Sequence, residues 1–309
     1  MKIVFFATPD ITLESFKYFI DSPDYDVLAL VTQKAKAANR GKKIIERNIT
    51  KIAKENSIPV FEPDKISKEP EIIENLKSLE PDFFITFAFG QILSQEVIDI
   101  PKFATINLHA SLLPEYRGAN PIAQSIIEGK KYTGITTMKT VLELDAGDIC
   151  LQEKIEITED MNVIELMEEI SKISPKLLDK TLKGLYSGEL KSIPQEHGKA
   201  TFTKKLKKEE KEIDWQMNAQ DLHNKIRGMY LINTNHTTFD GKIIKVLKTK
   251  VVGKQGNCGE VLAIEKDGIT VGCSSNAIKL IKVKPEGKGE MDASAFANGA
   301  RIKIGAKFQ

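Results

Sequence analysis

Apolar strand-like runs alternate with helix-period segments through the first third of the chain. The pattern consists of strand-like runs at 2–7, 25–32, 58–61, 83–88 and 104–108 and helix-period runs at 13–20, 44–55 and 71–79. We therefore predict an α/β fold with a doubly wound, mostly parallel sheet, because strands covered by helices on both faces read as continuous apolar runs. Ligands of such sheets bind beyond the carboxyl ends of the strands.

The loops at these carboxyl ends restrict the class of ligand. The first strand is followed by Ala7-Thr8-Pro9-Asp10, which is not the glycine-rich GxGxxG turn that holds a pyrophosphate. We therefore expect no dinucleotide cofactor in this fold.

In the stretch FATINLHASLLPEYRG, residues 103–118, a predicted strand ends with two polar side chains. Asn107 and His109 are two positions apart, so they point the same way from an extended chain. An amide and an imidazole directed to one point can act on one substrate atom. Taken alone, the pair also fits a capped strand end with a hydrogen-bonded histidine.

Later segments predict a second domain. Strand-like runs at 135–141 and 149–157 flank the loop LELDAGD, and a core-facing helix follows Asn162 and Glu165, which form a capping pair. After a polar, charged run, short strand-like segments separated by glycine turns resume between 242 and 284. We predict an α/β domain at 1–189, a linker at 190–208 and a small OB-like β-barrel at 209–309.

Charge is distributed unevenly along the chain. Residues 1–200 contain 25 Lys and Arg against 31 Asp and Glu, whereas residues 201–309 contain 20 against 12, so a net charge of +2 conceals balances of −6 and +8. A basic C-terminal third favours a polyanionic partner, because lysines that neutralise phosphates release counterions. A solvated lysine-rich surface is the alternative.

The remaining composition favours a cytoplasmic protein without metal or membrane partner. The cysteines, Cys150, Cys258 and Cys273, form no metal-spaced cluster or CxxC pair. The start of the chain runs directly into a strand and shows neither a signal sequence nor a membrane-length apolar run. We expect no obligate protein partner.

The central stretch resembles the NxHxSLLPxxRG signature of the folate-dependent formyltransferases. All the signature positions match, from Asn107 and His109 to Arg117 and Gly118, and the family's LDxG turn is matched by 144–147. The similarity covers nearly the whole chain. It implies transfer of a formyl group from 10-formyltetrahydrofolate to an amine.

The resemblance implies that Asn107, His109 and Asp145 are the catalytic residues. The reaction needs a donor to the formyl oxygen as charge develops on it, which suits Asn107. It also needs a group that moves protons near neutral pH, which suits His109. Asp145 would favour the imidazolium by charge pairing or would order a water, and the sequence leaves both roles open.

The folate site is also implied by the resemblance. Its wall would be formed by Ser111, Leu112, Leu113 and Pro114, with a cis bond before Pro114. The pterin pocket would be lined, mainly through backbone groups, by Phe89, Gly90, Ile92 and Leu93.

Within the family, the chain is most similar to members that formylate the methionine amino group on initiator tRNA. The NRGKK loop carries this similarity, and Arg40, Lys42 and Lys43 are the implied tRNA contacts beside the site. The chain departs from these members at Ala7, where glycine is common, and at 227–239, where a PWPxA-like turn is absent.

Two other functions stay open at this point. A sugar-nucleotide N-formyltransferase would use the same donor and a similar C-terminal barrel, but it has no need of a basic loop beside the site. A non-enzymatic RNA-binding module would explain the basic C-terminal third, but it leaves Asn107, His109 and Asp145 without a purpose.

Overall fold

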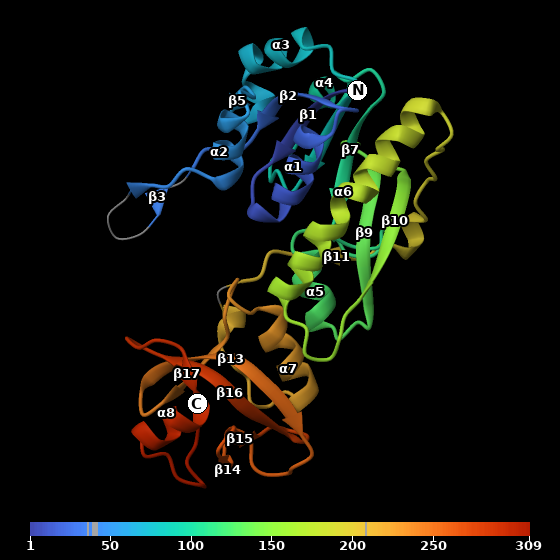
Figure 1. The fold of residues 1–309 in the computed structure, drawn as a ribbon. Coiled ribbons are helices and arrows are strands. Elements are labelled where there is room, and N and C mark those ends of the chain that lie inside the picture. Colours follow the sequence, from blue (N-terminus) through green and yellow to red (C-terminus); the bar gives the residue numbers. More distant parts are fainter. Residues whose placement is uncertain (36, 39–42, 208) are drawn as a thin grey trace. The chain divides into compact units, whose positions relative to one another are not determined.

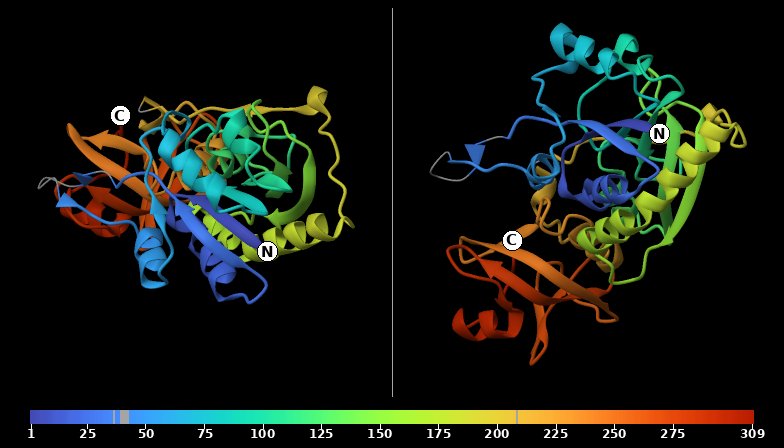
Figure 2. Two further views of the ribbon diagram at one scale, coloured as in Figure 1. Left: turned by 90° about the horizontal axis from the view of Figure 1, so that it is seen from above. Right: turned by 45° about the horizontal axis from the view of Figure 1, so that its top comes forward.

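The computed structural model describes residues 1–35, 37–38, 43–207 and 209–309. The chain forms two compact units, each assembled from several segments (Figures 1 and 2). Unit 1 consists of Met1–Gly118, Gly134–Ile155 and Met167–Phe202. Unit 2 consists of Ala119–Thr133, Glu156–Leu166 and Thr203–Gln309.

The strands and helices are labelled in chain order. The strands are β1 (Lys2–Ala7), β2 (Asp26–Val31), β3 (Ala37–Ala38), β4 (Lys43–Ile44), β5 (Val60–Phe61), β6 (Phe83–Phe87), β7 (Ala104–His109), β8 (Arg117–Gly118), β9 (Tyr132–Lys139), β10 (Ile149–Glu156), β11 (Phe202–Thr203), β12 (His236–Phe239), β13 (Lys242–Val252), β14 (Val261–Glu265), β15 (Gly268–Gly272), β16 (Ala277–Pro285) and β17 (Met291–Asp292). The helices are α1 (Leu13–Asp21), α2 (Asn48–Glu55), α3 (Pro70–Ser78), α4 (Gln95–Ile98), α5 (Pro121–Ile127), α6 (Val163–Ser187), α7 (Ala219–Gly228) and α8 (Ala293–Gly299).

The main sheet of unit 1 has the order β10-β9-β7-β6-β1-β2-β5. Parallel pairing joins the five strands from β7 to β5, and β9 pairs antiparallel with β7. The predicted α/β class with a mostly parallel sheet is confirmed. Since β7 lies between β6 and β9, the residues at its end are supported from two sides.

The side chains of β1 alternate between two apolar layers. Phe5 packs on Phe16 and Phe19 of α1, with ring centroids 5.4 and 6.1 Å away. Val4 and Phe6 join a separate buried cluster, with side chains of α3 and α4. Burial of apolar surface in each layer stabilises the fold by about 25 cal/mol per Å². Burial on both faces explains why this strand reads as an unbroken apolar run.

Helix α6 starts at the predicted capping pair and packs on the sheet. Asn162 Oδ1 accepts from the Glu165 N–H at 3.2 Å, and the Asn162 N–H donates to Glu165 Oε2 at 2.8 Å, as in a capping box. Farther along α6, the hydroxyls of Thr181 and Thr137 are 2.7 Å apart, so this part of the helix lies directly on β9.

Helix α2 begins four residues later than the helix-period run at 44–55 predicted. Arg47 has an extended conformation, with φ −70° and ψ 146°, and is the residue before the helix. Its guanidinium donates to the carbonyl oxygen of Gln33 at 3.0 Å. This hydrogen bond to an earlier segment holds Arg47 in an extended conformation, at a position where the periodicity of the sequence still predicts helix.

Unit 2 is built on an antiparallel sheet of order β12-β13-β16-β15-β14, with β17 paired to β16. This agrees with the fold class predicted for the C-terminal part. Helices α7 and α8 contribute Leu222, Ile226 and Ala297 to its core. Trp215 is a core residue of unit 2 and donates its indole N–H to Thr237 Oγ1 at 3.2 Å.

The last residues of the sequence connect the two ends of this sheet. Gln309 exchanges two backbone hydrogen bonds with Thr238 of β12, at 2.9 and 3.0 Å. The Phe308 N–H donates to the Gly259 carbonyl at 2.9 Å, just before β14. The segment therefore satisfies backbone groups that the end strands would otherwise leave open, as barrel closure does.

The sequence analysis did not predict α5, β12, β17 or α8 of unit 2. Helix α5 packs closely on α7 at Gly228. A Cβ at Gly228 would lie 2.7 Å from Ile127 and 3.0 Å from the Ala123 carbonyl, so this approach requires glycine. Local periodicity does not reveal such a helix, because it is only two turns long.

Within the described residues, no helix is both long and apolar enough to cross a membrane.

Phe308→Ala should destabilise unit 2. Its ring is 1% exposed and lies beside Trp215 and Phe239, at centroid distances of 6.0 and 5.3 Å. Loss of a buried phenylalanine side chain costs about 3–5 kcal/mol. Because the chain has a single tryptophan, Trp215 fluorescence during urea unfolding reports this unit directly. The control Ile304→Ala, at a side chain 69% exposed, should change stability by less than about 0.5 kcal/mol. Equal effects of the two variants would contradict the closing role of Phe308.

Candidate functional site

Asn107 and His109 lie at the carboxyl end of the central strand β7. Asn107 is paired with Thr86 of β6 and with Met138 of β9. The Thr86 hydroxyl donates to Asn107 Oδ1 at 2.9 Å. Because the amide oxygen is occupied, the Nδ2 amino group is the part of Asn107 left to donate to a ligand.

The ring of His109 is buried and oriented by a backbone carbonyl. Its Nε2 lies 2.9 Å from the Tyr116 carbonyl oxygen, and the residue is 7% exposed. Since a carbonyl only accepts, Nε2 carries the proton and donates it. In the neutral ring, Nδ1 is then the basic nitrogen. It faces Asp145 Oδ2 at 3.7 Å, which is within ion-pair range but too long for a hydrogen bond.

Asp145 is held in the turn between β9 and β10. Its backbone has a φ of 49°, in the left-handed region that Asp tolerates better than most residues. Its Oδ2 accepts from the Gly118 N–H at 2.7 Å. Gly147 completes the turn, and a Cβ there would collide with the Lys139 carbonyl, so the LDxG pattern needs its glycine for close backbone approach.

Residues 116–118 therefore orient both the histidine and the acid. Arg117, between them, is 1% exposed and donates through Nε and Nη2 to Gln195 Oε1, at 3.1 and 2.8 Å. The Gln195 amino group in turn donates to the carbonyls of Asp145 and Gly147, at 2.9 and 2.7 Å. A buried guanidinium is thereby connected to the turn that carries the acid.

Sequence reasoning missed Gln195 because it lies in the predicted linker, 190–208. Residues 190–202 belong to unit 1. Thr201 also contacts the site stretch, since its carbonyl and hydroxyl accept from the N–H groups of Arg117 and Tyr116, both at 2.8 Å. A polar run without periodicity carries no local signal for such contacts. The sequence also does not show that Arg117 is buried, so its need for a partner became visible only in the structure.

The predicted folate wall, Ser111 to Pro114, is a loop fixed by Thr136 of β9. The Thr136 hydroxyl accepts from the Leu113 N–H at 3.1 Å and donates to the Ser111 carbonyl at 2.6 Å. The bond between Leu113 and Pro114 is cis, as the resemblance implied. Ser111 and Leu113 are buried, whereas Leu112 and Pro114 are partly accessible.

The predicted pterin-pocket residues differ in what they expose. The side chains of Phe89 and Leu93 belong to a buried core cluster, whereas Ile92 is 78% exposed. The Phe89 carbonyl already accepts from Thr8 Oγ1 at 3.0 Å and from Gln33 Nε2 at 2.7 Å. Gly90 has a φ of 78°. Of these predicted residues, only Ile92 offers a widely exposed apolar side chain.

The predicted tRNA contacts fall mostly outside the structure's description. Arg40 and Lys42 are not among the described residues, and Lys43 is described only through its backbone in β4. Their contacts therefore stay predictions.

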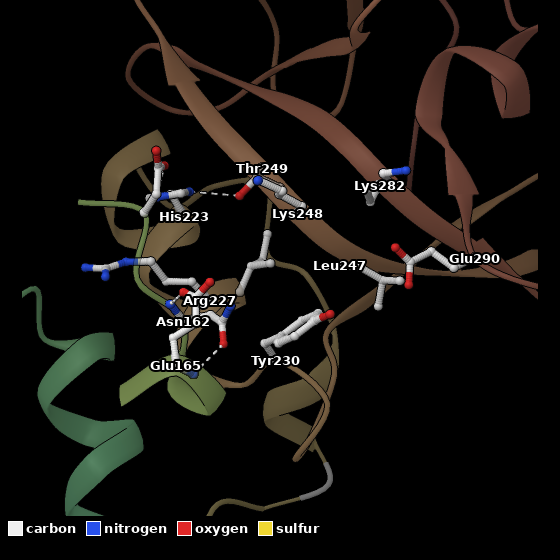
Figure 3. A pocket seen from close by; sticks show the side chains of 12 residues that line it. Asn162, Glu165, His223, Arg227, Tyr230, Leu247, Lys248, Thr249, Lys282 and Glu290 are labelled. Carbon is white, nitrogen blue, oxygen red and sulfur yellow. Dashed lines mark hydrogen bonds and ion pairs between the residues drawn. The ribbon is translucent and has the colours of Figure 1, made fainter. Parts of the chain in front are cut away.

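A pocket of about 260 Å³ in unit 2 is lined by polar and charged side chains, shown in Figure 3. His223 lies in it, with Nδ1 2.9 Å from Thr249 Oγ1 and Nε2 3.2 Å from the Glu159 carbonyl. Burial lowers the pKa of His223, which favours the neutral ring. Both ring nitrogens are used within the protein.

Arg227 in the same pocket is likewise engaged. Its Nε and Nη2 donate to Asn224 Oδ1 at 3.0 and 2.9 Å, and its Nη1 donates to the carbonyls of Thr158 and Met161 at 3.1 and 2.8 Å. These bonds hold the segment before α6 against α7. The arrangement serves packing rather than ligand binding.

Comparison with known proteins gives consistent matches over the whole chain. Residues 1–182 match the model of the Formyl transferase family, and residues 205–301 match that of the Formyl transferase, C-terminal domain. Methionyl-tRNA formyltransferase of Clostridium botulinum is 42% identical over 306 residues, which cover 98% of each chain. Methionyl-tRNA formyltransferase of Sulfurihydrogenibium sp. is 38% identical over 312 residues, which cover both chains completely.

Solved structures share the fold at low sequence identity. HypX from Aquifex aeolicus in complex with tetrahydrofolic acid is 17% identical with a TM-score of 0.65, and the match covers 98% of this chain and 48% of that one. WlaRD, a sugar 3N-formyl transferase, is 16% identical with a TM-score of 0.67, and the match covers 94% of this chain and 99% of that one.

Gln195→Ala should destabilise unit 1. The substitution removes the acceptor of two bonds from a fully buried guanidinium and leaves two carbonyls of the acid-bearing turn without their donor. We expect the unfolding free energy to fall by about 3 kcal/mol. Urea unfolding followed by far-ultraviolet circular dichroism measures this loss. The exposed Gln95→Ala is the control and should stay within about 0.5 kcal/mol of the wild type. A wild-type midpoint for Gln195→Ala would show that the network contributes nothing to stability.

Proposed function

Because the chain belongs to the formyltransferase family, and within it to the methionyl-tRNA formyltransferases, we propose that it transfers a formyl group from 10-formyltetrahydrofolate to the methionine amino group of initiator tRNA. The observation that carries the mechanism is the placement of His109 Nδ1 3.7 Å from Asp145 Oδ2, on the strand that also bears Asn107.

Asn107 acts as the donor to the formyl oxygen. Its Oδ1 is held by the Thr86 hydroxyl, so Nδ2 is directed to the ligand side. As the acceptor amine attacks the formyl carbon, negative charge develops on this oxygen and strengthens the bond from Nδ2. One such donor is worth about 3 kcal/mol of transition-state stabilisation.

His109 moves the proton. Its Nδ1 takes a proton from the attacking amine, and the same proton passes to N10 as the bond between the formyl carbon and N10 breaks. The Tyr116 carbonyl holds the Nε2 side of the ring throughout. Asp145 stabilises the imidazolium by charge at 3.7 Å, and its own position is set by the Gly118 N–H.

The donor cosubstrate is held mainly by backbone. The loop from Ser111 to Pro114, fixed through Thr136, forms one wall, and Ile92 offers an exposed apolar contact for the pterin side. A rigid wall keeps the formyl carbon within reach of Asn107. The bound cosubstrate is therefore already oriented for reaction.

The tRNA acceptor is held by basic residues. Arg40, Lys42 and Lys43 contact phosphates near the aminoacyl end, and the +8 balance of residues 201–309 supplies further attraction to the polyanion. The sugar-nucleotide alternative has no use for either feature.

His109→Ala and Asn107→Ala should each lower kcat for formyl transfer by about 10²-fold or more, which is the scale of lost proton transfer or oxyanion donation. Turnover is measured with radiolabelled 10-formyltetrahydrofolate and charged initiator tRNA. His236, a half-buried histidine on β12, provides the control His236→Ala, which should retain turnover. A variant at either site residue with near-normal kcat would remove that residue from the mechanism.

A triple variant replaces Arg40, Lys42 and Lys43 with glutamine. We expect its KM for tRNA to rise roughly tenfold and its kcat to fall, because the loop both holds the tRNA and positions the amine. Binding of the folate cosubstrate should not change.

The matched control for this variant replaces Lys172, Lys176 and Lys180 with glutamine. These lysines are exposed on α6, and their loss changes the net charge by the same amount. Initial rates with charged initiator tRNA and with a sugar-nucleotide amine are compared in parallel. Wild-type tRNA kinetics in the loop variant, with efficient transfer to the sugar nucleotide, would favour the sugar-nucleotide alternative.

A further inference from the structure

The loop that follows β6 has left-handed backbone on both sides of Phe89. Ala88 has a φ of 51° and Gly90 has a φ of 78°. Left-handed backbone is strained for a residue that carries a Cβ, and such strain persists only where the surroundings fix the backbone from several sides. Ala88 is exposed, so burial of its own side chain does not offset the strain. The conformation of this loop must therefore be held by other residues.

Phe89 is fixed at both its ring and its carbonyl. The ring is buried and meets the ring of Phe6 edge-on, at a centroid distance of 5.4 Å. The carbonyl oxygen accepts from Gln33 Nε2 at 2.7 Å and from Thr8 Oγ1 at 3.0 Å. These two bonds occupy both lone pairs of the oxygen. The Phe89 carbonyl therefore holds the loop and has no capacity left for a ligand.

Gln33 packs directly on this loop and is itself held in place. A Cβ at Gly90 would lie 2.5 Å from Gln33 Nε2, so the amide of Gln33 lies against the backbone of Gly90. The backbone N–H of Gln33 donates to Thr8 Oγ1 at 3.4 Å, and its carbonyl accepts from Arg47 Nε at 3.0 Å. Because its main chain is fixed on both sides, Gln33 delivers its amide to Phe89 from a defined position.

Gln91 holds the opposite side of the loop. Its Nε2 donates to the Pro63 carbonyl at 3.0 Å, and its Oε1 accepts from the Ile66 N–H at 2.9 Å. The backbone N–H groups of Gly90 and Ile92 have no hydrogen-bond partner among the described residues. They are therefore available to acceptor atoms such as the carbonyl oxygen and ring nitrogens of a pterin.

We propose that Gln33 is a positioning residue for the formyl donor, because it holds residues 88–91 in the left-handed conformation that receives the pterin ring. The proposal rests on the proposed function, in which the pterin of 10-formyltetrahydrofolate lies against this loop. Gln33 acts through the Phe89 carbonyl and does not touch the cosubstrate. Without the Gln33 amide, strain at Ala88 drives the loop toward ordinary backbone conformations. The apparent affinity for the donor then falls by the fraction of molecules that keep the binding conformation.

The test uses the full-length variant Gln33→Met, which keeps an unbranched side chain of similar length but removes the donor. Initial rates are measured at varied 10-formyltetrahydrofolate and saturating charged initiator tRNA. We expect KM for the donor to rise roughly tenfold and kcat to be retained, because the bound cosubstrate restores the loop. A second variant, Gln33→Glu, keeps the shape of the side chain, and its carboxylate cannot donate. Its KM should rise at least as much.

Two fragments of the cosubstrate show which part of it depends on Gln33. A tetrahydropterin represents the ring, p-aminobenzoylglutamate represents the tail, and each is assayed as a competitive inhibitor. In Gln33→Met, the inhibition constant of the tetrahydropterin should rise by the same factor as KM, whereas that of p-aminobenzoylglutamate should not change. Equal rises for both fragments would indicate a general loss of structure and would overturn the positioning role.

The matched control is Gln124→Met. Gln124 is also half-buried, and its Nε2 donates to Glu128 Oε1 at 2.9 Å on α5. The substitution therefore makes the same chemical change away from the loop. Its KM for the donor should equal that of the wild type, and a rise as large as in Gln33→Met would overturn the assignment to Gln33.

The outcomes also separate this proposal from the proposed function. If the wild type formylates charged tRNA and both Gln33 variants keep the wild-type KM for the donor, the positioning role is refuted and the function stands. If the wild type neither binds 10-formyltetrahydrofolate nor formylates tRNA, the proposed function fails and the role of Gln33 fails with it.

Discussion

The buried guanidinium of Arg117 is the constraint on which the site depends. A charge that is 1% exposed must be hydrogen-bonded within the protein, and Gln195 Oε1 accepts two of its bonds, while Glu143 Oε1 lies 3.5 Å from its Nη1 and His197 Nδ1 lies 3.3 Å from its Nη2. Because the Gln195 amide also donates to the carbonyls of Asp145 and Gly147, it holds the turn that carries Asp145 beside Arg117. On either side of Arg117, a carbonyl orients His109 and an N–H orients Asp145. One buried charge thus links the three segments that carry the proposed proton transfer.

The sheet gives this network a rigid base. Strand β7 lies between β6 and β9, so Asn107 and His109 project from the most supported position in unit 1. β9 also carries Thr136, whose hydroxyl fixes the loop from Ser111 to Pro114. The strand that carries Asn107 and His109 and the strand that fixes this loop are therefore neighbours in one sheet. Sites built on such strands hold their geometry more precisely than sites on free loops, as orientation-dependent catalysis requires.

Unit 2 combines an apolar interior with a strongly basic exterior. Its core contains the aliphatic side chains of β13 and β16, while the lysines on the same strands are exposed or half-buried. Among the described residues, acidic partners neutralise Lys279 and Lys282 but not Lys245 or Lys284. Net charge of this kind costs stability through self-repulsion and gains attraction to a polyanion. The surface charge of unit 2 is therefore compensated only in part.

The sequence by itself determined the element types and the site motif, because these are local signals. Strands buried on both faces read as apolar runs, the capping pair Asn162 and Glu165 is contiguous, and the spacing of Asn107 and His109 is a property of one strand. Tertiary structure alone decided what lies far apart in the chain. It brought Gln195 from a polar run to Arg117, moved Trp215 into a core, delayed α2 through the contacts of Arg47, and set Lys245 against Lys284 by strand register. Such contacts depend on which residues, distant in the sequence, become neighbours in the fold. The local sequence does not identify them, because any residue of suitable chemistry can partner a buried charge or a strand.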